Sequence, residues 1–169
     1  MISRRNLVSG LAALVLSPGV LATPAFAEAA FKRLLPLLVD LPGWQGAKGD
    51  GMTMEAGDGE MTVVSRRYQK DSANFEAGVI KGAAAVGAMA PLNAAMKVET
   101  AEMHMLTGEI AGFNALRSYN NADRSGAIIV KLADDAIFNV NYRQISEGDA
   151  LALASKFDWK AIVAVLGAK

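Results

Sequence analysis

The stretch from Ile110 to Tyr142 reads IAGFNALRSYNNADRSGAIIVKLADDAIFNVNY, and it decides the fold that we expect for the whole chain. Apolar and polar side chains alternate with a period of two in three successive runs, which is typical of β-strands that have one buried face. The segments 120–126 and 133–135 separate the runs and are rich in residues that favour turns. The stretch therefore predicts three antiparallel strands joined as a meander.

The first 27 residues have the features of a secretory signal peptide. A charged start with Arg4 and Arg5 precedes the apolar stretch 7–21, and Ala25-Phe26-Ala27 supplies a small-x-small cleavage site. The arginine pair resembles the twin-arginine export signal of bacteria, but the residues after it depart from the usual pattern and leave general secretory export open. The apolar run is short for a span of about 20 residues. We therefore expect cleavage and a periplasmic protein without a membrane span.

Cleavage would leave residues 28–169, a length that fits one domain. The full chain has 17 basic and 17 acidic side chains, so the loss of Arg4 and Arg5 leaves 15 basic and 17 acidic. This balance gives no electrostatic attraction to nucleic acid. The chain contains no cysteine, which excludes disulfides, thiolate metal sites and a cysteine nucleophile.

The remaining segments predict both helices and strands. Residues 28–40 carry one apolar helical stripe that Pro36 interrupts, so we expect a short or kinked helix. The expected strands outside the meander are 52–56 and 61–68, joined as a hairpin, then 75–79 and 102–107. The expected helices after the first are 91–98, 150–156 and a last one that Asp158 caps and Gly167 ends. Residues 81–90 fit a lid, a loop or a first short helix.

These elements predict an α+β fold, with an antiparallel sheet of about six to seven strands flanked by N-terminal and C-terminal helices. An Ile-x-Gly-x-x-Ala element, formed by Ile110, Gly112 and Ala115, stands before the final hairpin, and residues 157–166 close the chain as a helix. Motif and element order resemble the PsbP/Mog1-like family of small sheet-and-helix proteins, which includes bacterial periplasmic relatives. The resemblance implies an accessory or ligand-binding role in a larger assembly, without a shared catalytic site.

No arrangement of residues in the sequence identifies a reaction. His104 is the only histidine, which excludes paired-histidine metal sites, and no nucleophile elbow or glycine-rich phosphate loop accompanies it. We interpret His104 as a structural residue of a strand. Arg66, Arg67 and Tyr68 end a predicted strand, and we interpret them as a solvated strand end.

Methionines form the one chemically suggestive pattern. Two Met-x-Met pairs occur, Met52 with Met54 and Met103 with Met105, and the thioethers of each pair project from the same face of a strand. Thioethers favour Cu(I), so the two pairs could form a copper site if their strands adjoin. The alternative is that these methionines are adaptable core residues.

The sequence thus predicts an exported, periplasmic, non-enzymatic accessory or ligand-binding protein that needs no cofactor, whose partner is another protein or a small ligand. The alternative prediction is a periplasmic copper-binding protein that uses Met52, Met54, Met103 and Met105. These two hypotheses make different demands on the fold, because only the second requires the two Met-x-Met strands to be neighbours.

Overall fold

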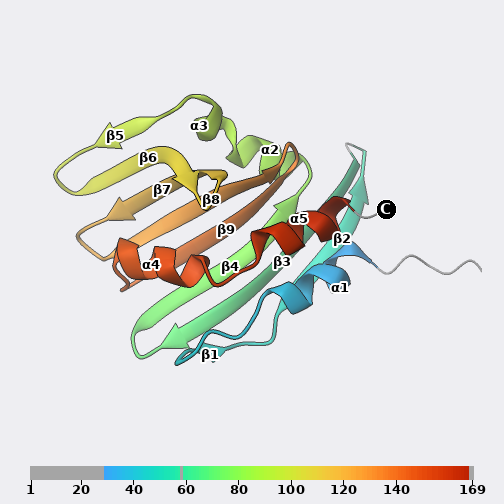
Figure 1. Ribbon diagram of the computed structural model, residues 1–169, viewed down its shortest axis with the longest axis horizontal. Coiled ribbons are helices and arrows are strands. Elements are labelled where there is room, and N and C mark those ends of the chain that lie inside the picture. Colours follow the sequence, from blue (N-terminus) through green and yellow to red (C-terminus); the bar gives the residue numbers. More distant parts are fainter. Residues whose placement is uncertain (1–28, 58, 168–169) are drawn as a thin grey trace, which may run out of the picture.

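The computed structural model describes residues 29–57 and 59–167 (Figure 1). Its strands are β1 (Gln45–Gly46), β2 (Asp50–Ala56), β3 (Gly59–Lys70), β4 (Ala73–Lys81), β5 (Lys97–Glu99), β6 (Met103–Ile110), β7 (Phe113–Asn120), β8 (Ser125–Ala133) and β9 (Ala136–Arg143). Its helices are α1 (Ala30–Leu34), the 3₁₀ helix η1 (Leu35–Leu37), α2 (Ala83–Ala88), α3 (Ala90–Asn93), α4 (Glu147–Ala154) and α5 (Trp159–Gly167). The predicted signal peptide lies outside the described residues. None of the described helices has the length and apolar character needed to cross a membrane.

All the described strands belong to one antiparallel sheet, ordered β1-β3-β4-β9-β8-β7-β6-β5, with β2 also paired to β3. The chain builds one edge with β1 to β4 and then passes through α2 and α3 to the opposite edge (Figure 1). From there the meander returns strand by strand until β9 pairs with β4. The predicted meander is confirmed as β7, β8 and β9, and these strands join the two halves of the sheet.

The main core lies on one face of the sheet, which we call the helix-covered face. Alternate residues of the central strands point to it, and the most completely buried include Val64, Phe75, Val79, Ile128, Val130, Phe138 and Val140. Buried residues from α1, α4 and α5 complete the same cluster. Figure 1 shows these three helices on one side of the sheet. The period-two pattern in the sequence thus selects the face that the helices cover.

Helices α2 and α3 pack on the opposite face, close to one end of the strands. Ala85 and Met89 are buried with Ile137 in a second, smaller cluster, against which Ile80 and Ile129 also pack. Within the segment 81–90, residues 83–88 therefore form the short helix α2, which is seated on the sheet. Gly82 links this helix to the β8–β9 turn through its N–H, which donates to the Asp135 carbonyl at 2.7 Å.

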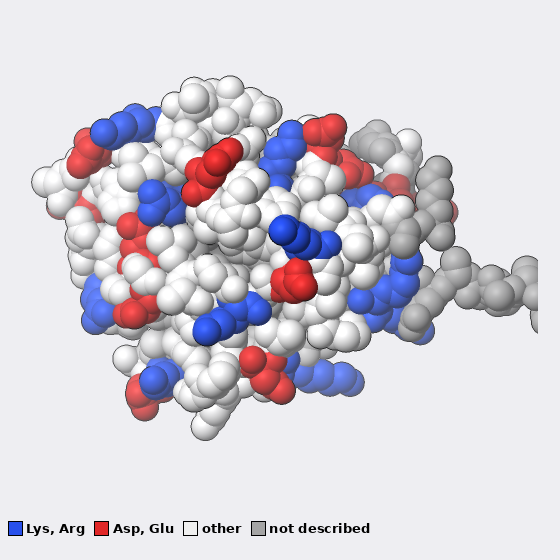
Figure 2. Space-filling view, viewed as in Figure 1, with Lys and Arg blue, Asp and Glu red and all other residues white. Residues whose placement is uncertain are grey.

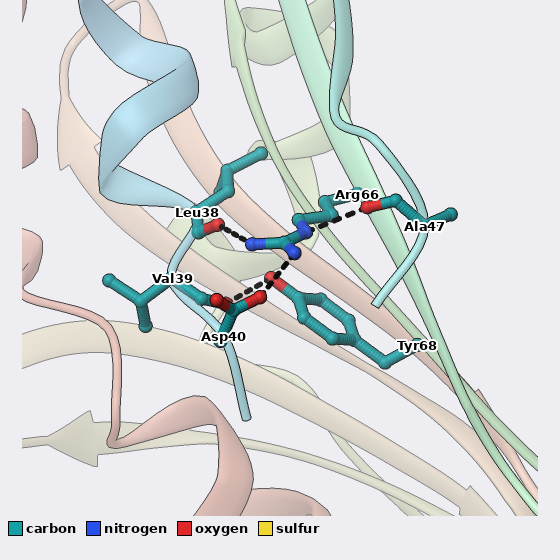
Figure 3. A network of polar contacts seen from close by, with 6 residues as sticks. All are labelled: Leu38, Val39, Asp40, Ala47, Arg66 and Tyr68. Atoms are coloured by element: carbon teal, nitrogen blue, oxygen red, sulfur yellow. Dashed lines mark hydrogen bonds and ion pairs between the residues drawn. The ribbon is translucent and has the colours of Figure 1, made fainter. Parts of the chain in front are cut away.

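A polar network holds the segment between η1 and β2 on the sheet (Figure 3). The Arg66 guanidinium donates to the carbonyls of Leu38, at 2.7 Å, and Ala47, at 2.9 Å, and pairs with Asp40. The Tyr68 hydroxyl donates to the Val39 carbonyl at 2.7 Å. Burial raises the pKa of Tyr68 to about 12, although the positive charge of Arg66 opposes this rise.

The network corrects the prediction that Arg66, Arg67 and Tyr68 form a solvated strand end. The Arg66 side chain is 18% exposed and Tyr68 is 1% exposed. Only Arg67, whose side chain is 80% exposed, fits that prediction. Arg66 is partly buried because irregular backbone covers it here. The carbonyls of Leu38 and Ala47 in that backbone need donors, and the guanidinium supplies them.

The predicted fold class, α+β with about six to seven strands and flanking helices, is wrong. The fold is β-rich, and the described chain forms a nine-stranded antiparallel sheet with a few short helices. The prediction missed β1 and β5 because strands of two and three residues are too short to show a period. The first helix is short, as expected from Pro36, and consists of five residues of α1 followed by a 3₁₀ turn.

Two local predictions need correction as well. The helix expected over 91–98 ends at Asn93, and Val98 lies in β5. The strand expected over 102–107 extends from Met103 to Ile110, and the chain reverses at Ala111 and Gly112, both with positive φ. The predicted cap of the last helix is confirmed, because Asp158 Oδ1 accepts from the Ala161 N–H at 2.9 Å.

Candidate ligand-binding site

The sheet face opposite the main core changes from apolar to polar along its strands. Directly opposite residues of an antiparallel pair share a face, so the register defines rows that cross the sheet. The row Val63–Ile80–Ile137 lies near the α2–α3 cover. Farther along the strands come the rows Ser65–Gly78–Asn139 and then Arg67–Glu76–Asn141. We call the part formed by these last two rows, extended by the Asn74–Arg143 pair, the polar face.

A hollow of about 460 Å³ lies at this end of β3, β4, β9 and β8. Its lining consists of Arg67, Tyr68, Asn74, Phe75, Glu76, Ser125, Gly126, Asn141, Tyr142 and Arg143, and we call it the Arg143 hollow. Most of its polar side chains alternate onto the polar face. Its volume lies within the range of small-molecule sites in proteins.

The charges of the Arg143 hollow leave one cation without a partner. Arg67 Nε lies 3.3 Å from Glu76 Oε2, and both side chains are substantially exposed, at 80% and 39%. Arg143 forms no ion pair with any residue in the described part of the chain. With Arg67 and Glu76 balancing each other, the lining carries one net positive charge. A guanidinium that is free to form two parallel hydrogen bonds is suited to a carboxylate.

Neutral groups in the hollow add hydrogen-bonding capacity beside this charge. Asn74 and Asn141 each offer an amide donor and an acceptor, and Ser125 offers a hydroxyl. The Ser125 hydroxyl already donates to Asp123 Oδ1 at 2.6 Å, so it remains available mainly as an acceptor. At the Tyr142 hydroxyl, burial and then the negative charge of Glu147 raise the pKa, which keeps this group neutral. The hollow therefore combines one cation with neutral polar groups.

The structure does not bring the two Met-x-Met pairs together. Met52 and Met54 lie on β2 and Met103 and Met105 on β6, and the order of the sheet places five strands between them. At about 4.8 Å for each inter-strand step, the pairs are roughly 29 Å apart along the sheet. The adjoining strands that a shared copper site requires are therefore absent. In addition, no group of three or more acidic or histidine side chains in the described residues could hold a metal ion.

His104 lies on the helix-covered face, where sequence reasoning missed its partners. Its Nε2 is 3.2 Å from Glu147 Oε2, and Arg117 is 3.5 Å from the other carboxylate oxygen. His104 is paired with Tyr119 and Arg117 with Leu106, so His104 and Arg117 are diagonal neighbours on the same face of β6 and β7. Glu147 reaches both from the first turn of α4. The sequence gives no indication of this contact. An acid such as Glu147 in the first turn of a helix is common in any case, because negative charge is favourable there.

Charges of both signs are interspersed over the helix-covered face, and among the residues coloured by charge neither sign gathers into a large patch (Figure 2). The described residues of this face therefore offer no extended basic surface of the kind that binds a phosphate backbone. Among the described residues, the Arg143 hollow brings an arginine without an ion pair, amide groups and aromatic side chains together on a concave surface, and it is the candidate site that we take further.

Comparison with protein-family models, with curated proteins and with solved structures finds no match to this chain. The inferences about function that follow therefore rest on the residues and on the geometry of the fold.

Proposed function

We propose that this protein is an exported, non-enzymatic binding protein of the bacterial periplasm, and that it holds a small organic acid in the Arg143 hollow. The observation that carries the proposal is the guanidinium of Arg143, which lines a hollow of about 460 Å³ and forms no ion pair with a described residue. A ligand carboxylate would supply the missing partner.

The charge of the lining favours a monocarboxylate over a phosphate. Arg67 is engaged by Glu76, so one positive charge is left for the ligand. A phosphate dianion would meet the Glu76 carboxylate with only that single charge to offset the repulsion. The amides of Asn74 and Asn141 suit hydroxyl or carbonyl groups on the rest of the ligand.

The export half of the proposal rests on the sequence. A charged start, an apolar stretch and the Ala25-Phe26-Ala27 cleavage site have the order of a signal peptide. The resemblance to the PsbP/Mog1-like family supports an accessory role, in which the protein would present or deliver its ligand to a larger assembly. Export is tested by fractionating cells that carry the chain with Arg4 and Arg5 replaced by lysines. Continued export would indicate the general secretory route, and retention would indicate the twin-arginine route.

Ligand binding is tested by calorimetric titration with lactate, benzoate and inorganic phosphate. We expect one of the monocarboxylates to bind, and we expect Arg143→Gln to weaken its binding at least tenfold. Arg124→Gln is the matched control, because Arg124 is also an exposed arginine near this end of the sheet but does not line the hollow. Equal losses in the two variants, or binding of phosphate alone, would contradict the proposal.

Native mass spectrometry of the protein purified from its own periplasm provides a second test. A bound organic acid that is lost in Arg143→Gln would identify the ligand directly. A mass equal to that of the polypeptide alone, together with no binding of the monocarboxylates in calorimetry, would remove the basis for a small-molecule function. Co-purification with another polypeptide would instead favour a protein partner.

A further inference from the structure

The two edges of the sheet differ in how they are protected. At one edge β5 has only three residues, and its two charged side chains form an ion pair along the strand, with Lys97 Nζ 3.5 Å from Glu99 Oε2. Short strands and lysines are common devices that prevent a sheet edge from pairing with another chain. At the other edge β2 has seven residues, without lysine or proline. Its Met52 and Met54 side chains are 50% and 39% exposed, and no described strand pairs with its outer side.

The backbone groups that β2 presents at this edge can be identified. The Gly51 N–H donates to the Asp50 carboxylate of its own strand at 2.8 Å, so it does not bond to β3. In an antiparallel pair, alternate residues direct their N–H and C=O groups to opposite sides of the strand. The backbone groups of Gly51, Thr53 and Glu55 therefore point to the free edge.

We propose that β2 pairs antiparallel with β2 of a second copy of this chain, about a two-fold axis that passes through Thr53. A two-fold axis perpendicular to the sheet keeps the faces of both copies aligned, so it must pass through a residue position. With the axis at Thr53, the outward backbone groups of Gly51, Thr53 and Glu55 all face partners in the second copy. Thr53 then lies opposite Thr53 of the second copy, and Gly51 lies opposite Glu55.

Side chains support this register. Met52 lies opposite Met54 of the second copy, which covers the exposed thioethers of both chains. The two acids of the strand, Asp50 and Glu55, face Ala56 and Gly51, so no like charges are directly opposed. On pairing, the Gly51 N–H would exchange its bond to the Asp50 carboxylate for one to the Glu55 carbonyl of the second copy. A contact of one strand per copy is small, so we expect a dimer that dissociates on dilution.

The absence of cysteine from the chain allows a direct test of the register. In the hydrogen-bonded pair at the axis, the two Cα atoms would lie about 5.5 Å apart, which is within the range that a disulfide spans. The variant Thr53→Cys should therefore form a disulfide-linked dimer under mild oxidation. Glu55→Cys is the control, because the two introduced thiols would lie roughly 14 Å apart along the strands. Equal cross-linking of both variants, or none in Thr53→Cys, would overturn the proposal.

Sedimentation velocity over a wide range of concentrations tests the association without a covalent link. We expect the unmodified protein to shift from monomer to dimer as concentration rises. Thr53→Pro removes the outward N–H and should raise the dissociation constant at least tenfold, since proline at an edge leaves the bonds to β3 intact. Thr53→Val loses the same hydroxyl contact to Thr62 but keeps the N–H, so it should still dimerise. A protein that stays monomeric throughout, or one that pairs only with a different polypeptide, would refute the inference. None of these outcomes depends on the Arg143 hollow.

Discussion

The Nε2 atom of His104 lies 3.2 Å from Oε2 of Glu147, at the contact between β6 and the first turn of α4. Arg117 approaches the second oxygen of the same carboxylate at 3.5 Å. The three side chains are between 20% and 32% exposed. The carboxylate also lies at the N-terminus of a helix, where negative charge is favourable. Glu147 thus attaches α4 to two strands that are far from it in sequence.

Replacing Glu147 with glutamine should lower the free energy of unfolding by about 1 kcal/mol, because Arg117 and His104 lose their anionic partner in a partly screened setting. The measurement is urea denaturation at neutral pH. Glu109→Gln is the control, since Glu109 is an exposed acid on the same strand as His104. It should change the free energy by less than about 0.5 kcal/mol. Similar effects of the two substitutions would show that the ion pairs contribute nothing.

Replacing Arg66 with methionine should cost about 2–3 kcal/mol, because the carbonyls of Leu38 and Ala47 lose a charged donor together. Methionine keeps most of the aliphatic volume. The adjacent variant Arg67→Met changes an 80% exposed side chain and should cost less than about 0.5 kcal/mol. Thermal and urea unfolding of the two variants would measure the difference, and a loss for Arg67→Met as large as that for Arg66→Met would contradict the network.

Local sequence patterns were sufficient to predict strands and hairpins where the alternating runs were long. The alternation around Ile128, Val130 and Phe138 correctly identified a meander, and the hairpin of 52–56 with 61–68 is confirmed by the register of β2 and β3. The fold class was wrong because strands as short as β1 and β5 show no period, so the sequence understated the share of strand in the fold. The order in which strands join a sheet depends on long-range pairing, such as β4 with β9, and sequence periodicity does not encode it.

The Arg143 hollow could not have been predicted for the same reason. Arg67, Asn74, Asn141 and Arg143 come from three strands, and only the register places them at one end of the sheet. Taken singly, each is an ordinary polar residue at a strand end. The separation of the two Met-x-Met pairs could not have been predicted either, because only the strand order shows that five strands lie between β2 and β6.

Tyr68 should make the stability of the protein fall at alkaline pH. Burial raises its pKa from 10.0 to about 12, so the unfolded chain loses this proton first as the pH rises. The stabilisation is therefore fully present below pH 10 and is lost between pH 10 and about 12. Ultraviolet titration of phenolate absorbance, with Tyr68→Phe to assign the signal, would measure this. Ionisation of Tyr68 at its ordinary value would be inconsistent with its burial beneath Val39.

Gly126 should be intolerant of any side chain. A Cβ built there would lie 2.2 Å from the Ser118 carbonyl oxygen and 2.5 Å from the Tyr142 hydroxyl. Real Cβ atoms do not approach backbone so closely, so Gly126→Ala must displace β7 or β8 and should cost more than about 2 kcal/mol. Gly108 is the matched control, because it is also a strand glycine, yet nothing lies within 4 Å of its added Cβ. Gly108→Ala should therefore be neutral or stabilise slightly through the unfolded state. Urea denaturation of both variants decides the question, and equal stabilities would mean that the close approach of Gly126 to Tyr142 relaxes without cost.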